Sequence, residues 1–261
     1  MVGNLLLRGM LVGIVAGLLC FGFLKVFGEP QVDRAIAFET QMDQAKAQAQ
    51  ADAERAKGIA VMPEEPEPEL VSRPVQAGIG LLTGVVVYST AFGGLFALVF
   101  AFIHGRVGRF GPRANSALLA AAGLIAIYVI PNLKYPANPP SVGNPDTIGI
   151  RTALYFTMIV ISIAAMVAAV MLRRRLLARH GAWNASLIAG AAYLLAVIVA
   201  GLLMPAINEV PDLFPAVTLW KFRMASMGAQ VIMWGTLGLG FGALTEHAAM
   251  SRGNAQLRMA R

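Results

Sequence analysis

Hydrophobic residues are concentrated in six long blocks, which are separated by shorter polar segments. The blocks lack the alternation of polar and apolar positions that is typical of half-buried strands. A block of about 20 apolar residues can cross the ~30 Å hydrocarbon core of a bilayer as a helix. We therefore predict an all-α integral membrane protein with six transmembrane helices, which span approximately residues 5–27, 74–103, 114–130, 152–172, 183–204 and 224–244.

The boundaries of these helices group them into three hairpins. A proline, which cannot continue a helix, is expected to end the first helix of each pair, at Pro30, Pro131 and Pro205. An arginine opens the second helix of each pair, at Arg73, Arg151 and Arg223. A positive charge at a helix N-terminus opposes the macrodipole. These arginines are therefore expected either to pair with acidic residues or to anchor helix ends at lipid headgroups.

A long polar segment, residues 28–73, connects the first two helices. Residues 33–57 contain no glycine or proline and are rich in alanine, glutamine and charged residues, which predicts a surface helix. We expect its Ala35, Ile36 and Phe38 to dock on the membrane face or on other loops. Residues 63–69 combine proline with glutamate, which predicts an extended acidic linker.

Glycines spaced four residues apart indicate helix faces that pack closely. The first helix carries Gly13 and Gly17, and the second carries Gly80 and Gly84. The sixth helix is dense in glycine, with Gly228, Gly235, Gly238, Gly240 and Gly242. This helix is therefore expected to lie against neighbouring backbones and not to face lipid.

The distribution of charge predicts the orientation in the membrane. The chain is 57% hydrophobic and only 13% charged, with a formal net charge of +7. The short loops on one side would hold ten arginines or lysines, and those on the other side four. The positive-inside rule then places both termini in the cytoplasm and the acidic first loop outside. The basic charge is thus explained by orientation, without nucleic acid, and residues 1–261 are predicted to form a single membrane domain.

Residues typical of catalysis are sparse. The three histidines, His104, His180 and His247, fall on the predicted cytoplasmic side and are not at metal-ligand spacing. The single cysteine, Cys20, lies inside the first helix. No nucleophile and base, and no glycine-rich phosphate loop, can be recognised. We therefore expect neither an enzyme nor a permanently bound cofactor.

Oxygen ligands are found in two proline-rich outer loops. Asp146 lies in one of them, and Glu209 and Asp212 lie in the other. Oxygen donors suit weak, transient binding of a hydrated divalent cation, so we predict these three carboxylates as metal ligands. The alternative is that they cap helices and pair with Arg151 and Arg223.

Further residues of the outer segments are predicted to shape this site. Prolines stiffen a loop and reduce the entropy that it loses on ordering. The predicted loop residues are Glu29, Asp33, Glu39, Tyr135, Asn138, Pro139, Arg151 and Arg223. Polar side chains inside the helices are few, and Gln230 is predicted as part of a cation path.

Two stretches give the chain a resemblance to a known family. They are Gly28-Glu29-Pro30 with Asp33 and residues 35–39, and the run from Tyr135 through Pro140 to Asp146 and Arg151. With them the chain resembles the CbtA family of proposed cobalt transporter subunits of bacterial inner membranes. The resemblance implies uptake of cobalt or a similar divalent cation together with a small single-span partner, CbtB, whose histidine-rich segment would supply nitrogen ligands.

An alternative of another class stays open at this point. The same helix faces and loops fit a non-conducting structural or assembly subunit of a larger membrane complex. Self-association into a homo-oligomer is a further alternative. The two functions differ in whether the outer carboxylates affect metal uptake or only the recovery of a complex.

Overall fold

The structure is a computed structural model that describes residues 2–58, 71–106 and 110–259, with side chains described as far as Ser251. The linker expected over residues 63–69 lies outside the described residues. Within them, every regular element is a helix. Five helical units are long and apolar enough to cross a membrane: Val2–Phe27, Arg73–Ile103, Pro112–Lys134, Pro145–Leu203 and Ala216–Ser251.

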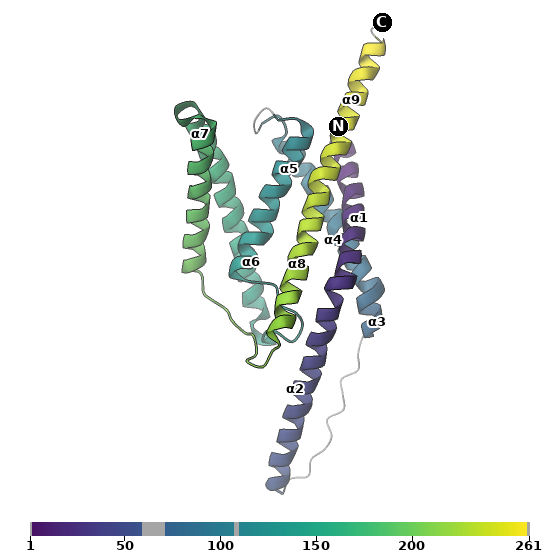
Figure 1. Cartoon of the computed structure of the whole chain (residues 1–261), viewed down its shortest axis with the longest axis vertical. Helices are drawn as coiled ribbons and strands as arrows, with labels where there is room; N and C mark the ends of the chain where they lie inside the picture. The colour runs from purple at the N-terminus through teal and green to yellow at the C-terminus, as the bar shows by residue number, and fades with distance from the viewer. Residues whose placement is uncertain (1, 59–70, 107–109, 260–261) are drawn as a thin grey trace.

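The longest unit contains two of the predicted transmembrane helices. Its main element, α7, covers Ile148–Leu203, and the chain turns back within α7 at Gly181 (Figure 1). Gly181 has a φ of 70° and a ψ of 170°, and a positive φ favours glycine because a Cβ atom would collide with the backbone. The two arms of α7 correspond to the helices expected over residues 152–172 and 183–204.

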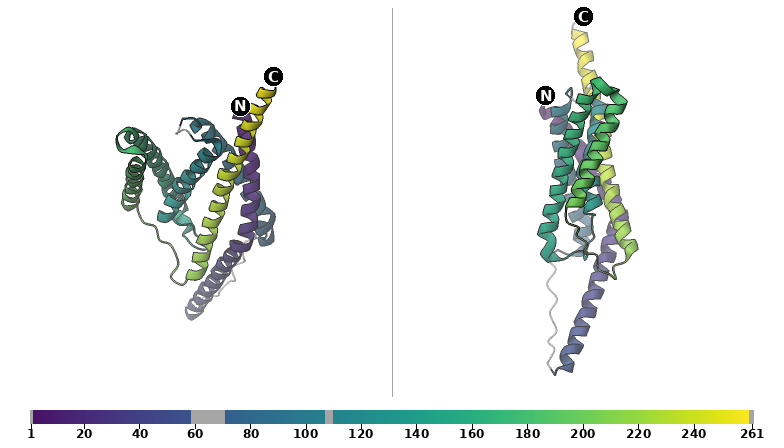
Figure 2. Two further views of the ribbon diagram at one scale, coloured as in Figure 1. Left: turned by 45° about the horizontal axis from the view of Figure 1, so that its top comes forward. Right: turned by 90° about the vertical axis from the view of Figure 1, so that its left-hand side faces the viewer.

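The first helix ends at Phe27, as expected, but Pro30 does not stop the helical run that follows. α1 (Val2–Phe27) is followed directly by α2 (Glu29–Ala56), because Gly28 keeps right-handed helical φ and ψ angles. Pro30 lies in the first turn of α2, where a backbone N–H would lack a helical partner in any case. α2 includes the surface helix expected over residues 33–57 except for its last residue, Lys57, which is the C-cap. It therefore continues α1 and extends beyond the rest of the molecule (Figures 1 and 2).

The third helix also continues past the proline at which it was expected to end. α5 (Pro112–Gly123), η2 (Leu124–Val129) and α6 (Ile130–Lys134) follow one another without a break, and η2 is a π-helical segment. Such wider turns allow a transmembrane helix to accommodate a proline, which cannot donate a backbone hydrogen bond. The helix therefore ends at Lys134, and Pro131 is buried within it.

Helices α1 and α4 (Leu81–Ile103) are in backbone contact. A Cβ atom placed on Gly9 would lie 2.2 Å from the carbonyl oxygen of Gly93, and one placed on Gly13 would lie 2.4 Å from that of Ser89. Two helices can approach this closely only where side chains are absent or very small. The packing face expected for the first helix is confirmed.

The matching face on the second helix is not the expected one. This helical unit begins with α3 (Arg73–Val75) and the π-helical η1 (Gln76–Gly80), which precede α4. A Cβ atom on Gly80 or Gly84 would meet no neighbouring helix, whereas one on Gly93 would. The spacing of glycines identifies a smooth helix face, but it does not say on which side a partner helix lies.

Helix α8 (Ala216–Thr236) completes the main bundle with α1, α4 and α5, and continues through η4 (Leu237–Phe241) into α9 (Gly242–Met259). Large side chains fill the centre of this bundle. They include Phe96, Phe100, Trp234, Leu237 and Phe241. As expected, the glycines of the sixth helix pack against neighbouring residues, with the exception of Gly235.

The α7 hairpin lies beside the main bundle and contacts it through α6 and η2 (Figure 1). Its buried residues are Met158, Ala169, Ala189, Tyr193 and Val197, which pack with Ile130 of α6. The two chain termini lie at the same end of the molecule as the α7 turn (Figure 1). The other end of the bundle, from which α2 projects, carries η3 (Pro145–Thr147) and two proline-rich loops, residues 135–144 and 204–215 (Figure 1).

These two loops pack around the base of α2. Ala35 of α2, Val142 of the first loop and Phe214 of the second form a buried apolar cluster. Phe38 meets Phe214 edge to face, with ring centroids 5.1 Å apart. The Ser141 hydroxyl donates a hydrogen bond of 2.8 Å to the Ala35 carbonyl oxygen. The docking of α2 on other loops is thus confirmed for Ala35 and Phe38, whereas Ile36 is not part of the cluster. This docking fixes both loops against the bundle.

Candidate functional site

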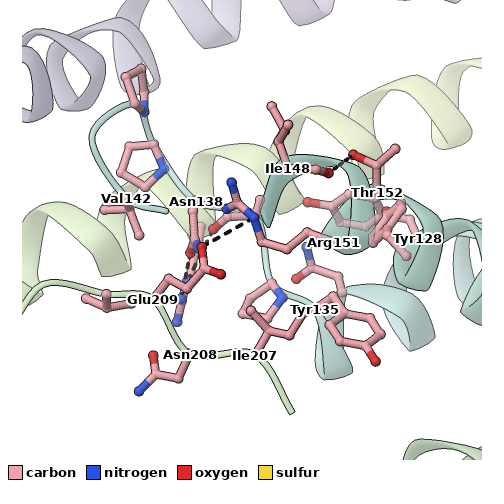
Figure 3. A pocket seen from close by; sticks show the side chains of 18 residues that line it. Tyr128, Tyr135, Asn138, Val142, Ile148, Arg151, Thr152, Ile207, Asn208 and Glu209 are labelled. Atoms are coloured by element: carbon pink, nitrogen blue, oxygen red, sulfur yellow. Dashed lines mark hydrogen bonds and ion pairs between the residues drawn. The ribbon is translucent and has the colours of Figure 1, made fainter. Parts of the chain in front are cut away.

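A cavity of about 750 Å³ lies between the two proline-rich loops (Figure 3). Its walls combine both loops with the adjoining ends of η2, α6, α7 and α8. The lining residues are Tyr128, Asn132, Tyr135, Pro136, Ala137, Asn138, Pro139, Pro140, Val142, Ile148, Arg151, Thr152, Tyr155, Ile207, Asn208, Glu209, Val210 and Arg223. Among them, Tyr135, Asn138, Pro139, Arg151, Glu209 and Arg223 were predicted from the sequence.

Arg223 of α8 holds the first loop in place. Its Nε donates to the Ala137 carbonyl oxygen over 3.2 Å, and its Nη2 donates to Asn138 Oδ1 over 2.8 Å. The Tyr135 hydroxyl adds a hydrogen bond of 2.8 Å to the Pro205 carbonyl oxygen, which joins the two loops. The proline-rich stretch is therefore a fixed wall of the cavity.

Arg151 stands near the start of α7 and packs against backbone. Its Nη2 donates to the Asn144 carbonyl oxygen over 3.2 Å, and its Nε lies 3.4 Å from Glu209 Oε2. A Cβ atom on Gly143 would lie 2.1 Å from Arg151 Nη1, and Gly143 has a positive φ of 129°. Glycine at this position therefore provides the space that the guanidinium occupies.

Several donors converge on Glu209. The Asn144 backbone N–H donates to Glu209 Oε2 over 2.7 Å. The Thr147 hydroxyl, this N–H and the charge of Arg151 together hold the pKa of the Glu209 carboxyl below its usual range, although desolvation opposes the shift. The Thr147 hydroxyl also donates to the Asn144 carbonyl oxygen 2.9 Å away, so its single proton is divided between two acceptors. Glu209 is thus ionised at neutral pH.

The structure does not bring the three predicted metal ligands together in the cavity. Glu209 lines it, whereas Asp146 is exposed on η3 and Asp212 is exposed in the second loop. The Asp146 backbone N–H donates to Asn144 Oδ1 over 2.9 Å, as in a helix cap. Among the described residues, no three His, Cys, Asp or Glu side chains form a group that could hold a metal ion. Metal binding by this trio stays a prediction.

The predicted residues of the first outer segment form a separate cluster. Arg73 lies 2.9 Å from Asp33 Oδ1 through its Nη2, and the same nitrogen contacts the Glu29 carboxylate. Glu39 is exposed on α2. These residues anchor the start of the second helical unit to α2 and do not line the cavity.

Two tyrosines of the cavity were missed in the sequence. Tyr128 of η2 is buried and its hydroxyl lies 2.6 Å from Ser226 Oγ of α8. Tyr155 of α7 also lines the cavity. Tyr155 lies on a helix face that the sequence already marked, because it is four residues from Arg151 on α7. Tyr128 had no such signal, because Tyr135 lies beyond the end of α6 with non-helical φ and ψ angles.

The predicted path residue lies further along α8 than the cavity. Gln230 is half-buried and faces the Tyr88 hydroxyl of α4. It is two helical turns beyond Arg223, which corresponds to about 10 Å along the axis. The structure therefore places Gln230 inside the bundle, and it is not a lining residue of the cavity.

The chemistry of the cavity is that of a binding site. Its volume falls within the range of small-molecule pockets, about 300–1,000 Å³. Its lining offers two guanidinium groups, one carboxylate, three asparagine amides and three tyrosines. This set can bind and orient a polar molecule, and the lining contains no pairing of a nucleophile with a general base.

Long apolar helices and a polar cavity at one end of them are consistent with a multi-pass membrane transport protein. Residues 2–246 match the family described as probable cobalt transporter subunit (CbtA), and the chain belongs to this family. The match covers all the helices that form the bundle and both proline-rich loops. Neither a curated protein nor a solved structure matches the chain.

Proposed function

We propose that the chain is the membrane-embedded subunit of an uptake system for cobalt or a similar divalent cation. The family match over residues 2–246 carries this proposal, and the cavity between the proline-rich loops gives it a place where a substrate would first bind. Six of the residues predicted for the outer site line this cavity, which supports it as the entry point.

The proposed topology has six spans in three hairpins, with both termini in the cytoplasm of a bacterium and the cavity on the outer face of its inner membrane. The reversal of α7 at Gly181 supports the sixth span. Arginines 173–175 lie near the α7 turn, at the end that carries both termini, which agrees with the positive-inside rule. Trp183 and Trp220, both largely exposed, lie near the starts of their spans, Trp183 beside the α7 turn and Trp220 at the opposite side of the proposed membrane, as interfacial tryptophans do.

The proposal includes a partner protein, because the family is described as a transporter subunit. We propose a small single-span protein with a histidine-rich segment that delivers nitrogen ligands to the cation. The route through this chain would continue from the cavity past Tyr128 and Ser226 to Gln230 and Tyr88, which are polar side chains at membrane depth.

One observation favours a second candidate, a non-conducting assembly subunit. The charged lining residues of the cavity are two arginines and one glutamate, which gives a formal charge of +1. Such a lining disfavours a bare cation. In this second function the cavity and loops would dock other components, and the cation would cross elsewhere in the complex.

Uptake of radioactive cobalt separates the two functions. Cells expressing the chain, alone or with the small partner, are expected to accumulate cobalt above vector controls. Gln230→Leu is expected to lower uptake several-fold at unchanged protein level, because leucine removes a polar group from the proposed route. Gln48→Leu, on the exposed part of α2, is the matched control. Uptake that does not depend on the chain, although the protein is present in the membrane, would support the assembly subunit.

A further inference from the structure

The three arginines expected to open the second helix of each hairpin differ in how their charges are compensated, although α8 already begins at Ala216, seven residues before Arg223. Arg73 has two carboxylates within 4.0 Å and Arg151 has one. Among the described residues, no carboxylate lies within 4.0 Å of Arg223, whose hydrogen bonds go to the neutral oxygens of Ala137 and Asn138. Arg223 is half-buried two turns into α8 and lines the cavity. A guanidinium in this position is costly without an anionic partner.

The net charge of the cavity points in the same direction. Glu209 compensates Arg151, so Arg223 remains as the excess charge of the lining. Two unit charges a few ångström apart interact more strongly near a protein surface than in bulk water, because the effective dielectric constant is lower there. That interaction attracts an anion to Arg223 and repels a bare cation. α7 also begins at the cavity, with Ile148 in its wall, and the N-terminal end of a helix favours negative charge.

The shape of the donors selects the kind of anion. A guanidinium presents a planar fork of N–H groups that matches a carboxylate. Arg223 uses two of its five N–H groups on the first loop, which leaves three for a ligand. The amide of Asn132 and the hydroxyl of Tyr155 add neutral hydrogen-bonding groups, and about 750 Å³ accommodates a molecule far larger than a single ion.

We propose that this cavity binds a small polycarboxylate anion through Arg223, and that cobalt(II) reaches the chain as the complex of such an anion. The second clause rests on the proposed function, whereas the first concerns binding alone. The proposal accounts for a positive cavity in a family of cation transporters, because a metal bound by several carboxylates is carried as an anion.

Binding to the purified full-length protein in lipid nanodiscs tests the first clause. The probes are citrate without metal, cobalt(II) citrate and cobalt(II) chloride. Citrate is expected to bind, and Arg223→Gln is expected to weaken it at least tenfold, since a charge-assisted hydrogen bond contributes about 1.5–3 kcal/mol. Arg175→Gln, which removes an exposed charge near the α7 turn, is the matched control and is expected to leave binding unchanged.

A second variant covers the case in which Arg223→Gln disturbs the first loop. Asn132→Asp changes one lining residue into a nearly isosteric carboxylate and removes the excess positive charge. For an anion site it is expected to weaken citrate binding about tenfold, and for a bare-cation site it would strengthen cobalt(II) binding. Thermal unfolding of each variant verifies that the fold is retained.

The outcomes test separately whether the cavity binds a polycarboxylate anion, the first clause, and whether cobalt(II) arrives as the complex of such an anion, the second clause. Absence of citrate binding to the native protein, or tighter cobalt(II) binding in Asn132→Asp with citrate unaffected, overturns the anion site. Citrate binding without binding of cobalt(II) citrate overturns the second clause alone. Binding of both citrate forms, weakened in both cavity variants, supports the proposal. Failure of cobalt uptake in cells would count against the proposed function and not against the anion site.

Discussion

The main bundle and the α7 hairpin are stabilised in different ways. In the bundle, α1 and α4 touch through their backbones, and aromatic rings fill the space toward α8. In α7, only 17% of the most apolar stretch is buried within the protein, against 28–39% in the other four membrane units. The hairpin therefore presents most of its apolar surface outward and contacts the bundle through α6 and η2.

This difference bears on the cavity, because the cavity joins the two regions. Arg223 belongs to the bundle, whereas Arg151 and Tyr155 belong to α7. A small displacement of α7 would change the width of the cavity without breaking the glycine contacts between α1 and α4. We therefore expect substitutions in the bundle to affect folding, and substitutions at the ends of α7 to affect the cavity.

Gly93→Leu is expected to have the largest effect of the substitutions considered. A Cβ atom on Gly93 would lie 2.1 Å from the carbonyl oxygen of Gly9, and neither backbone can move aside without separating the helices. We expect a loss of about 3 kcal/mol or more of folding stability. The measurement is the midpoint of thermal unfolding in detergent, together with the yield of monodisperse protein.

The control for this prediction is Gly190→Leu in the second arm of α7. A Cβ atom at Gly190 would meet nothing within 4 Å, so the side chain would point into open space or lipid. Its unfolding midpoint is expected to stay near that of the native protein. If both variants unfolded at the same temperature, the proposed contrast between the regions would be wrong.

The fold was largely predictable, because long apolar blocks leave a membrane chain few alternatives to helices. The errors concern the residues at which those helices were expected to end. Pro30 and Pro131 both lie inside helical runs, the former in a first turn and the latter after a π-helical segment. A proline limits what can precede it, but local hydrogen bonding decides whether the helix ends.

The site was predicted in part. The arginines and the proline-rich loop were recognisable because such residues are unusual beside a membrane helix, and Arg151, Arg223 and Asn138 do line the cavity. The three carboxylates could not be assigned in the same way. Their grouping depends on loop backbone geometry, and Asn144 is a hydrogen-bond partner of both Glu209 and Asp146.

Glu209→Gln is expected to have an intermediate effect that is confined to the cavity end of α7. The ion pair with Arg151 is lost, while the Asn144 N–H keeps an acceptor. Amide hydrogen exchange is expected to increase in residues 144–152 and to stay unchanged in residues 85–97 of α4. Glu39→Gln, exposed on α2, is the matched control. Equal exchange in native and variant proteins would show that the pair does not hold α7.

The contribution of Glu209 also predicts a pH dependence. The carboxyl has a pKa below its usual value of 4.5 in the folded protein. Its stabilisation is therefore fully present above that value and is lost as the pH falls through the lower folded pKa. The difference in unfolding midpoint between the native protein and Glu209→Gln should be constant near neutral pH and shrink as the pH falls below 4.5. A difference that grew on acidification would contradict this assignment.

Tyr193→Phe is expected to have the smallest effect, and it tests how the two arms of α7 hold together. The hydroxyls of Tyr193 and Ser162 lie 2.9 Å apart, and both residues are buried between the arms. Hydrogen bonds between transmembrane helices contribute about 0.6 kcal/mol on average, so the variant should lose roughly this amount. A double-mutant cycle with Ser162→Ala isolates the pair from other effects of each substitution. A coupling near zero would mean that the arms are held by apolar packing alone, and the hairpin would then be still more loosely joined than its buried surface indicates.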